Sequence, residues 1–402
     1  MLSAKKEATP LIFVPGLFGS MSENIIQGTG KWHFGIASIV YDPFITALEQ
    51  ALGYQKDVDL FIAYYDWRKK VRVSFKEYLM KTIKKVKKQT NHKKVNIVAH
   101  SMGGLLTRAY IESRVYEKDI HQVILIGTPN SGCPPHYMYW TSGEKLAPSE
   151  PTLTPLFMNA YLYLFSYLYE TDITSTIHQQ FKGLRDLIPS EDYGNYLLKK
   201  GTLHWHWSNI SNMKTKNEFL NSLNKDARLL KKRKVKLSLI AGIGQQTING
   251  LKVISTSSKR GDGEVIGTLS TELGDGNTTV RSVFSIPGET YLLEGNHQSI
   301  LLQSIPLLQT ILGKKTTLQV DVPFIPEKDY LIMIVKGQGH LAVKNPLYQR
   351  TLANHTHFVL SHKAEAHVFH SHQKQTIDIC KIHFNKKEPT TLHVDEKEQV
   401  EL

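Results

Sequence analysis

The sequence predicts an α/β fold in which a mostly parallel sheet is covered by helices on both faces. From residue 11 to residue 126, short apolar runs alternate with segments of helical periodicity, which is typical of parallel strands joined by helical crossovers. The apolar runs are continuous, as expected for strands buried on both faces. With 41% hydrophobic residues, the 402-residue chain can bury the core that such a sheet requires.

The expected elements follow one another in a regular order. The strands are the apolar runs at residues 11–14, 59–64, 95–98, 123–126, 235–241 and 290–293. The helices have apolar residues at helical spacing and cover residues 42–52, 74–88, 101–112 and 298–312. The interruption at residues 133–207 is rich in aromatic residues and proline and contains no clear strand. We expect it to be a helical cap inserted at the top of the sheet.

The composition changes beyond residue 314. Leu318, Val320 and Val322 alternate with polar residues, and strand-like runs follow at residues 330–335, 358–360, 366–369 and 377–384. Several short strands at this spacing indicate a β-sandwich or barrel. We therefore expect an α/β domain of residues 1–314, which includes the cap, and a small β-sandwich-like domain of residues 315–402 with a loose, charged C-terminal tail.

Cysteine usage and the apolar segments exclude several classes of protein. Cys133 and Cys380 lie far apart and form no C-x-x-C pair, so we expect neither a disulfide framework nor a thiolate zinc site, and no cofactor. No apolar segment precedes Leu11, which argues against a secretory signal. The longest apolar stretch, residues 155–169, is shorter than the roughly 20 residues that span a bilayer. These features predict a cytoplasmic protein.

The net charge of +13 is concentrated in two lysine-rich runs, at residues 81–94 and 231–234. The favoured interpretation is a solvated helix face, because Leu79, Ile83 and Val86 repeat at helical spacing and leave the lysines outside. The second interpretation is peripheral contact with an anionic membrane surface. No stacking motif or recognition fold accompanies the charge, so nucleic acid is not an expected partner. The sequence does not indicate an oligomeric state.

Residues 95–104, V-N-I-V-A-H-S-M-G-G, carry the strongest chemical signal. An apolar run ends in a serine-centred turn and a helical pattern follows, as in the nucleophile elbow of α/β-hydrolases. Ala99 and Gly103, two residues on either side of Ser101, are small enough to let the strand and the helix approach closely. The pattern predicts that Ser101 is a nucleophile.

In an α/β-hydrolase the base and its orienting acid follow the serine in the order acid, then histidine. His297 comes after the strand expected at residues 290–293 and before a helix, which suits the base. Two motifs compete for the acid, G-D-G-E-V with Asp262 and G-D-G-N with Asp275. We choose Asp262 because the strand at residues 235–241 leads toward it, whereas an aspartate like Asp275 is common in turns.

The roles of these residues follow from the movement of charge. His297 takes the proton of Ser101 and returns it to the leaving group, while Asp262 fixes the imidazole tautomer. The backbone N–H groups of Met102 and of Leu17, in the loop after the first strand, are the expected oxyanion donors.

Several segments outside the serine turn share a pattern with one family. They are V-P-G-L-F-G-S at 14–20, Y-D-P-F-I-T-A-L-E-Q-A-L-G-Y at 41–54, Y-Y-D-W-R at 64–68, A-H-S-M-G-G at 99–104, G-T-P-N-S-G at 127–132, L-R-D-L-I-P at 184–189, G-D-G-E-V at 261–265 and H-Q-S-I at 297–300. The chain resembles the lecithin:cholesterol acyltransferase-like branch of the α/β-hydrolases, which includes phospholipases and acyltransferases. The resemblance covers residues 11–312.

The resemblance implies a nucleophile at Ser101, an acid at Asp262, a base at His297 and oxyanion donors at Leu17 and Met102. Two residues depart from the family's pattern. Ala99 replaces glycine in the serine turn, and Glu264 stands where threonine is usual.

Three aromatic residues are candidates for the cleft or for a lid over it: Trp67, Phe157 and Phe165. Trp67 contacts ligand or packs beside its strand. The stretch that holds Phe157 and Phe165 offers apolar surface to acyl chains or is an ordinary cap helix, and the sequence does not separate these alternatives.

The expected function is that of a serine hydrolase or acyltransferase that forms an acyl–enzyme from a lipid ester. Lipase, phospholipase and O-acyltransferase activities all use this intermediate. A carboxylesterase for small esters is the alternative, and a non-catalytic binding protein on a hydrolase scaffold is less favoured, since the triad order is complete.

Overall fold

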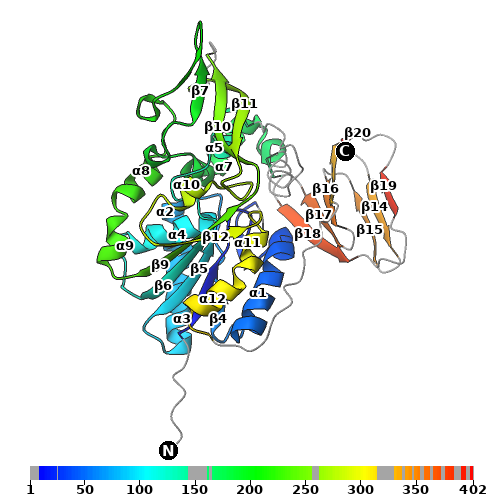
Figure 1. Cartoon of the computed structure of the whole chain (residues 1–402). Coiled ribbons are helices and arrows are strands. Elements are labelled where there is room, and N and C mark those ends of the chain that lie inside the picture. Colours follow the sequence, from blue (N-terminus) through cyan, green and yellow to red (C-terminus); the bar gives the residue numbers. More distant parts are fainter. Residues whose placement is uncertain are drawn as a thin grey trace, which may run out of the picture. The chain divides into compact units, whose positions relative to one another are not determined.

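We describe the protein from a computed structural model (Figure 1). The structure describes residues 9–24, 26–143, 161–162, 165–255 and 262–314, and the backbone of strands between residues 330 and 401. The chain divides into two compact units. The first consists of residues 1–20, 37–146 and 177–323, and the second of residues 21–36, 147–176 and 324–402.

The core of the first unit is a six-stranded sheet in which all neighbouring strands are parallel, which confirms the predicted fold class. Its order is β12-β9-β6-β5-β1-β4. The bounds are β1 (Leu11–Val14), β4 (Leu60–Ile62), β5 (Val95–His100), β6 (Ile120–Ile126), β9 (Lys236–Ile243) and β12 (Glu289–Glu294). The chain passes from β1 to β4 on one side and then places β5 on the other side of β1. Parallel sheets bind ligands at such a reversal, beyond the carboxyl ends of the strands.

Helices cover this sheet (Figure 1). α1 (Ser38–Leu52) contacts α11 (Ser299–Gln303) and α12 (Ile305–Ile311). A second group is formed by α2 (Val71–Ser74), the π-helical turn η2 (Phe75–Leu79), α3 (Met80–Thr90), α4 (Met102–Ile111) and α9 (Arg228–Lys232). The helix expected at residues 298–312 is divided at Ser304, because Pro306 in the next turn lacks the N–H that would continue the ladder.

The expectation that residues 133–207 contain no clear strand is wrong. Helices α5 (Pro134–Ser142) and α7 (Ile173–Gln180) and the 3-10 turns η3 (Lys182–Leu187) and η4 (Glu191–Tyr193) are followed by β7 (Leu197–Lys200) and β8 (Trp205–Trp207). These strands join β10 (Thr247–Ile254) and β11 (Glu264–Thr271) in a sheet of order β11-β10-β7-β8, called here the outer sheet. β7 escapes sequence analysis because its pairing partner β10 lies about fifty residues later in the chain.

The remaining elements of the first unit connect these layers. They are η5 (Ile210–Asn212), α8 (Glu218–Lys225) and α10 (Val280–Val283). Within the described residues, no helix combines the length and the apolar character that crossing a membrane requires.

The second unit contains a short hairpin and two C-terminal sheets. The hairpin pairs β2 (Met21–Asn24) with β3 (Thr29–His33), and η1 (Gly35–Ala37) follows it. One C-terminal sheet has the order β18-β17-β16-β13-β20 and the other the order β15-β14-β19. The bounds are β13 (Tyr330–Lys336), β14 (His340–Asn345), β15 (Tyr348–Ala353), β16 (His357–His362), β17 (Glu365–His372), β18 (Thr376–His383), β19 (Thr391–Val394) and β20 (Gln399–Glu401).

The expected C-terminal strands are present at residues 330–335, 358–360 and 366–369 and through most of 377–384. The alternation of Leu318, Val320 and Val322 lies outside the described residues. The tail is not uniformly loose, because β19 and β20 are strands. The domain division at residue 314 stays a prediction.

Candidate active site

Ser101 occupies a strained turn between β5 and α4. Its φ of 53° and ψ of −126° are unusual for a residue with a side chain, and its N–H donates to the carbonyl of Ile126 at 2.9 Å. Gly103 makes the turn sterically feasible, because a methyl group there would overlap the carbonyl oxygens of Val14 and Pro15. The sequence therefore places Ser101 directly at the carboxyl edge of the sheet, as expected for an elbow.

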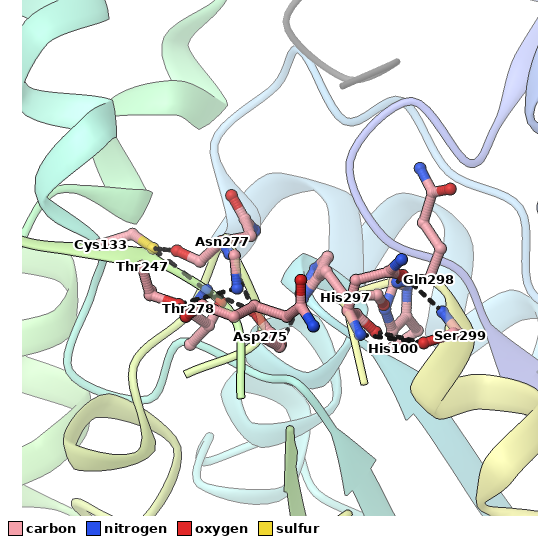
Figure 2. A network of polar contacts seen from close by, with 12 residues as sticks. His100, Cys133, Thr247, Asp275, Asn277, Thr278, His297, Gln298 and Ser299 are labelled. Carbon is pink, nitrogen blue, oxygen red and sulfur yellow. Dashed lines mark hydrogen bonds and ion pairs between the residues drawn. The ribbon is translucent and has the colours of Figure 1, made fainter. Parts of the chain in front are cut away.

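His297 reaches the same edge from the loop after β12. Its Nδ1 lies 2.7 Å from Oδ2 of Asp275, and its backbone N–H donates to the carbonyl of Asp275 at 2.8 Å (Figure 2). Because a carboxylate only accepts hydrogen bonds, Nδ1 carries the proton. Nε2 is buried and has no hydrogen-bond partner among the described residues. In the neutral imidazole, Nε2 is therefore the nitrogen that can accept a proton.

The structure corrects the choice of Asp262 as the acid. The Asp262 carboxylate accepts hydrogen bonds from the N–H groups of Lys214 at 2.6 Å and Thr215 at 2.9 Å, and Asp275 occupies the position beside His297. The reason is an insertion. β10 and β11 form a hairpin between the end of β9 and the acid loop, so that the chain leaves the central sheet and returns to it.

Two hydrogen bonds mark the return of the chain. The N–H of Gly244 donates to the carbonyl of Glu272 at 2.9 Å, and the N–H of Gln245 donates to the carbonyl of Gly274 at 3.2 Å. In space, Asp275 therefore follows β9 directly. Asp262 precedes β11 at the other end of the hairpin, where Ile254 pairs with Glu264.

Hydrogen bonds from the acid loop hold Asp275 in place. Its Oδ1 accepts from the N–H groups of Asn277 at 2.9 Å and Thr278 at 2.6 Å, which leaves Oδ2 for His297. Cys133 packs against the same loop, and its Sγ donates to the carbonyl of Asn277 at 2.7 Å (Figure 2). Burial raises the pKa of the Cys133 thiol to about 12, so this group is a neutral donor and not a nucleophile.

A directed chain of hydrogen bonds links three strand ends of the site. His100 Nε2 donates to the carbonyl of His297 at 2.9 Å, and a carbonyl can only accept. The other nitrogen, Nδ1, therefore accepts from the hydroxyl of Tyr41 at 2.9 Å, and the Tyr41 oxygen accepts from the N–H of Gly16 at 2.9 Å. Burial and the nearby His297 lower the pKa of His100, which keeps this ring neutral.

Sequence reasoning missed Tyr41 and His100, although both lie in the motifs 41–54 and 99–104. Their role could not be read from the chain because Gly16, Tyr41, His100 and His297 meet only in the folded sheet. A third residue that was missed is His136 in α5. Burial and His297 lower its pKa to about 4, and its Nδ1 has no hydrogen-bond partner among the described residues.

The expected oxyanion donors lie at the ends of adjacent strands. Leu17 follows β1 in a turn closed by a hydrogen bond from the Gly19 N–H to the Gly16 carbonyl at 3.0 Å. Met102 is the first residue of α4, where backbone N–H groups have no acceptor within the helix. Their contribution to catalysis stays a prediction.

The three aromatic candidates for the cleft or lid differ in where they lie. Trp67 is buried against Phe18 and Phe181, with ring centroids 4.4 Å and 5.6 Å away, and its Nε1 donates to the carbonyl of Ser20 at 3.0 Å. It braces the loop after β1. Phe165, in the second unit, is buried and stacks with two tyrosines of its own segment. Phe157 lies outside the described residues.

The neighbours of Trp67 also have a structural role. Arg68 donates from Nε to one carboxylate oxygen of Asp66 at 2.8 Å and from a terminal nitrogen to the other at 2.9 Å. Within the described part of the chain, no cluster of three or more histidine, cysteine, aspartate or glutamate side chains is arranged to hold a metal ion.

Comparison with models of protein families identifies the family of this chain. A family model described as lecithin:cholesterol acyltransferase matches residues 33–256, which is more than half of the sequence. The chain belongs to this family. The matched region includes Ser101 but ends before Asp275 and His297, so the contact between these two residues comes from the structure.

Two relatives from Arabidopsis thaliana match a short part of the chain. Lecithin-cholesterol acyltransferase-like 4 is 33% identical over 85 residues, and Phospholipase A(1) LCAT3 is 34% identical over 85 residues. Each alignment covers 20% of this chain, and they cover 16% and 19% of the respective relatives.

Two solved structures match the chain at low sequence identity. The Tle4–Tli4 complex matches with a TM-score of 0.49 and 13% identity, over 76% of this chain and 98% of that one. The mature form of Bacillus licheniformis lipase BlEst2 matches with a TM-score of 0.40 and 15% identity, over 78% of this chain and 95% of that one.

Proposed function

We propose that the protein is a lipid-ester hydrolase or acyltransferase that forms an acyl–enzyme on Ser101, with His297 as base and Asp275 as the acid that orients it. The observation that carries the proposal is the state of His297. Asp275 holds the protonated Nδ1 at 2.7 Å, and the buried Nε2, at the edge of the sheet that also holds Ser101, has no hydrogen-bond partner among the described residues. A general base needs such an available nitrogen.

The reaction proceeds in two balanced steps. The Ser101 oxygen attacks the ester carbonyl while its proton passes to His297 Nε2. The bond from the carbonyl carbon to the leaving alcohol then breaks, and Nε2 returns the proton to that alcohol. In the second step, water or an acceptor alcohol gives its proton to Nε2 and attacks the carbonyl carbon of the acyl–enzyme. The bond from that carbon to the Ser101 oxygen then breaks, the acid or new ester leaves, and Nε2 returns the proton to the Ser101 oxygen.

Two local features support the first step. The N–H groups of Leu17 and Met102 are the proposed donors to the oxyanion, and each such donor is typically worth about 100- to 1,000-fold in rate. The strained backbone of Ser101 holds its side chain at the end of β5, so little rearrangement is needed at the moment of attack. Membership of the lecithin:cholesterol acyltransferase family favours lipid esters over small esters as substrates.

Turnover of a lipid ester tests the proposal. Purified protein is mixed with phosphatidylcholine vesicles, with and without an added long-chain alcohol, and free fatty acid and new ester are quantified. We expect Ser101→Ala to lower both products at least about 10,000-fold. Ser113→Ala, just beyond the other end of α4, is the matched control and should keep wild-type activity.

Two results would count against the proposal. One is wild-type turnover by Ser101→Ala. The other is the absence of both products from folded wild-type protein. A product mixture dominated by fatty acid identifies water as the acceptor, and one dominated by new ester identifies the alcohol.

A further inference from the structure

The tip of the outer sheet exposes an unusual run of side chains. Residues 202–207, which form the β7–β8 turn and strand β8, are all exposed. Leu203 at the turn is 91% exposed, and Trp207 and Trp205 on β8 are 48% and 39% exposed. Single exposed apolar residues are ordinary, but one leucine and two tryptophans within five residues form a patch that usually marks an interaction site.

Strand register places the tryptophans on the same face. Trp205 lies opposite Lys200 and Trp207 opposite Leu198, and residues directly opposite each other in a sheet point to the same side. The Trp207 ring extends across the neighbouring strand, since a methyl group on Gly250 would lie 3.3 Å from it. The outward face of the outer sheet therefore combines Trp205 and Trp207 with Leu198 and Lys200.

The inner face of the same sheet is already packed. Leu197, Leu251 and Val253 are buried in a cluster with Tyr137 and Met138 of α5. The sheet thus has a complete core on one side, and the apolar residues of its outer side are additional. They are not needed to hold the sheet on the domain.

The outer sheet rises from the acid loop. β10 begins just after the end of β9, and β11 returns to Asp275. β7 runs parallel to β10, so Lys200 and the exposed turn lie at the end of the sheet remote from Asp275. Figure 1 shows β7, β10 and β11 projecting beyond the central sheet. The patch is therefore carried on the carboxyl-edge side of the molecule, the side that holds Ser101.

The lysine-rich helix face has the opposite location. α3 ends at Thr90 and leads into the start of β5, which is the amino edge of the central sheet. Two of its lysines are also engaged in ion pairs, Lys84 with Glu117 at 3.1 Å and Lys87 with Asp119 at 2.8 Å. A membrane bound by this face would lie at the edge away from Ser101.

We propose that residues 199–207 anchor the protein to an anionic lipid surface. Tryptophan rings settle at the level of the head groups, an exposed leucine enters the acyl region, and lysines are attracted to anionic head groups. Lys200 shares the face of the two tryptophans and precedes the turn that carries Leu203, so its cationic group is adjacent to the apolar groups. The inference rests on the proposed function in one respect, because the anchor presents the catalytic edge to its substrate.

Vesicle sedimentation tests the anchor without catalysis. The full chain carrying Ser101→Ala is mixed with vesicles of phosphatidylcholine alone or mixed with phosphatidylglycerol, and the bound fraction is measured. We expect Leu203→Asp to weaken binding at least about tenfold, because the leucine can no longer leave water. Val115→Asp is the matched control, since Val115 is 47% exposed just beyond α4, toward the amino edge, and should not change binding.

Two further measurements separate the electrostatic part of vesicle binding from the apolar part and separate binding from catalysis. Lys200→Glu should weaken binding to the phosphatidylglycerol vesicles and leave binding to phosphatidylcholine unchanged. Hydrolysis of a water-soluble ester by Leu203→Asp, with Ser101 intact, should equal that of wild type. If this hydrolysis is absent in wild type while vesicle binding depends on Leu203, the anchor stands and the proposed function fails.

Undiminished binding of Leu203→Asp to vesicles would overturn the anchor. So would a dimer in solution that Leu203→Asp dissociates while vesicle binding is unaffected, because the patch would then be an interface between copies of the chain. Such pairing is the other use of an exposed edge strand like β8.

Discussion

The serine turn after β5 and the acid loop beyond β9 contribute to the same site, but the chain encodes them differently. Most of what shapes the serine turn lies within about ten residues, apart from the carbonyl groups of Val14, Pro15 and Ile126. The acid loop closes across a hairpin, and Asp275 is held at the end of β9 by hydrogen bonds between residues almost thirty positions apart. A local motif therefore predicts the candidate nucleophile, whereas an inserted hairpin hides the candidate acid.

The largest expected effect is the difference in kcat between asparagine variants of the two candidate acids, Asp275 and Asp262. We expect Asp275→Asn to lower kcat for a water-soluble ester about 10,000-fold, because the amide favours the wrong imidazole tautomer. Asp262→Asn should stay within about twofold of wild type, since the Asp262 carboxylate accepts backbone hydrogen bonds from Lys214 and Thr215 and Asp275 holds His297. Steady-state kinetics at neutral pH check both variants.

A weaker effect tests the chain of hydrogen bonds that connects Gly16 to His297. Tyr41→Phe removes the hydroxyl that joins Gly16 to His100, and through His100 the carbonyl of His297. Two buried polar groups lose their partner, which costs about 1–3 kcal/mol for each. We expect kcat to fall about tenfold or more while KM changes little, as for a positioning residue.

Tyr110→Phe is the matched control for Tyr41→Phe. Tyr110 is also buried, and its hydroxyl donates to Asp119 at 2.7 Å on the side of α4 remote from Ser101. We expect a comparable loss of stability and a kcat within about twofold of wild type. Equal losses of kcat in the two tyrosine variants would show that the chain of hydrogen bonds does not position His297.

The smallest effect is a pH dependence of stability that comes from His136. The folded protein holds its pKa at about 4, below the ordinary value of 6.5, so the unfolded chain binds a proton more readily between these values. Acidification through this window therefore destabilises the fold, by about 2 kcal/mol between pH 7 and pH 5 for this one group. Denaturant unfolding of wild type and His136→Gln at both pH values measures the difference.

The His136 result has a simple control. His204 is exposed on the outer sheet, so His204→Gln should keep the pH dependence of wild type. If His136→Gln loses as much stability on acidification as wild type does, the buried ring does not carry this dependence.

The sequence predicts an element well when its interacting residues are close together along the chain, and poorly when they are far apart. Continuous apolar runs predict all six central strands; five of these strands are largely buried, whereas β12 at the edge of the sheet is largely exposed. Strands β7 and β8 are not predicted, since β7 pairs with the distant β10, β8 pairs only with β7 among the described strands, and both are short. The aromatic- and proline-rich composition of residues 133–207 predicts a cap and gives no sign of these two strands.

The residues of the candidate active site divide in the same way, into those within local motifs and those that meet only after folding. Ser101, Leu17 and Met102 belong to short motifs next to strands β1 and β5, and His297 follows a predicted strand directly. The sequence favours Asp262 over Asp275 as the acid, and nothing in it shows that β10 and β11 leave the central sheet and return. The contacts of Tyr41 and His100 also exist only after folding.

Covalent labelling with a fluorophosphonate tests the central claim most directly, because the reagent forms a stable adduct only with an activated serine. Folded wild-type protein and the Ser101→Ala, Asp275→Asn and Asp262→Asn variants are labelled at neutral pH, and the modified residue is mapped by mass spectrometry. The account predicts one adduct, on Ser101, formed at similar rates in wild type and Asp262→Asn, much more slowly in Asp275→Asn and not at all in Ser101→Ala. An adduct on another serine, or rapid labelling of Asp275→Asn with slow labelling of Asp262→Asn, would contradict it.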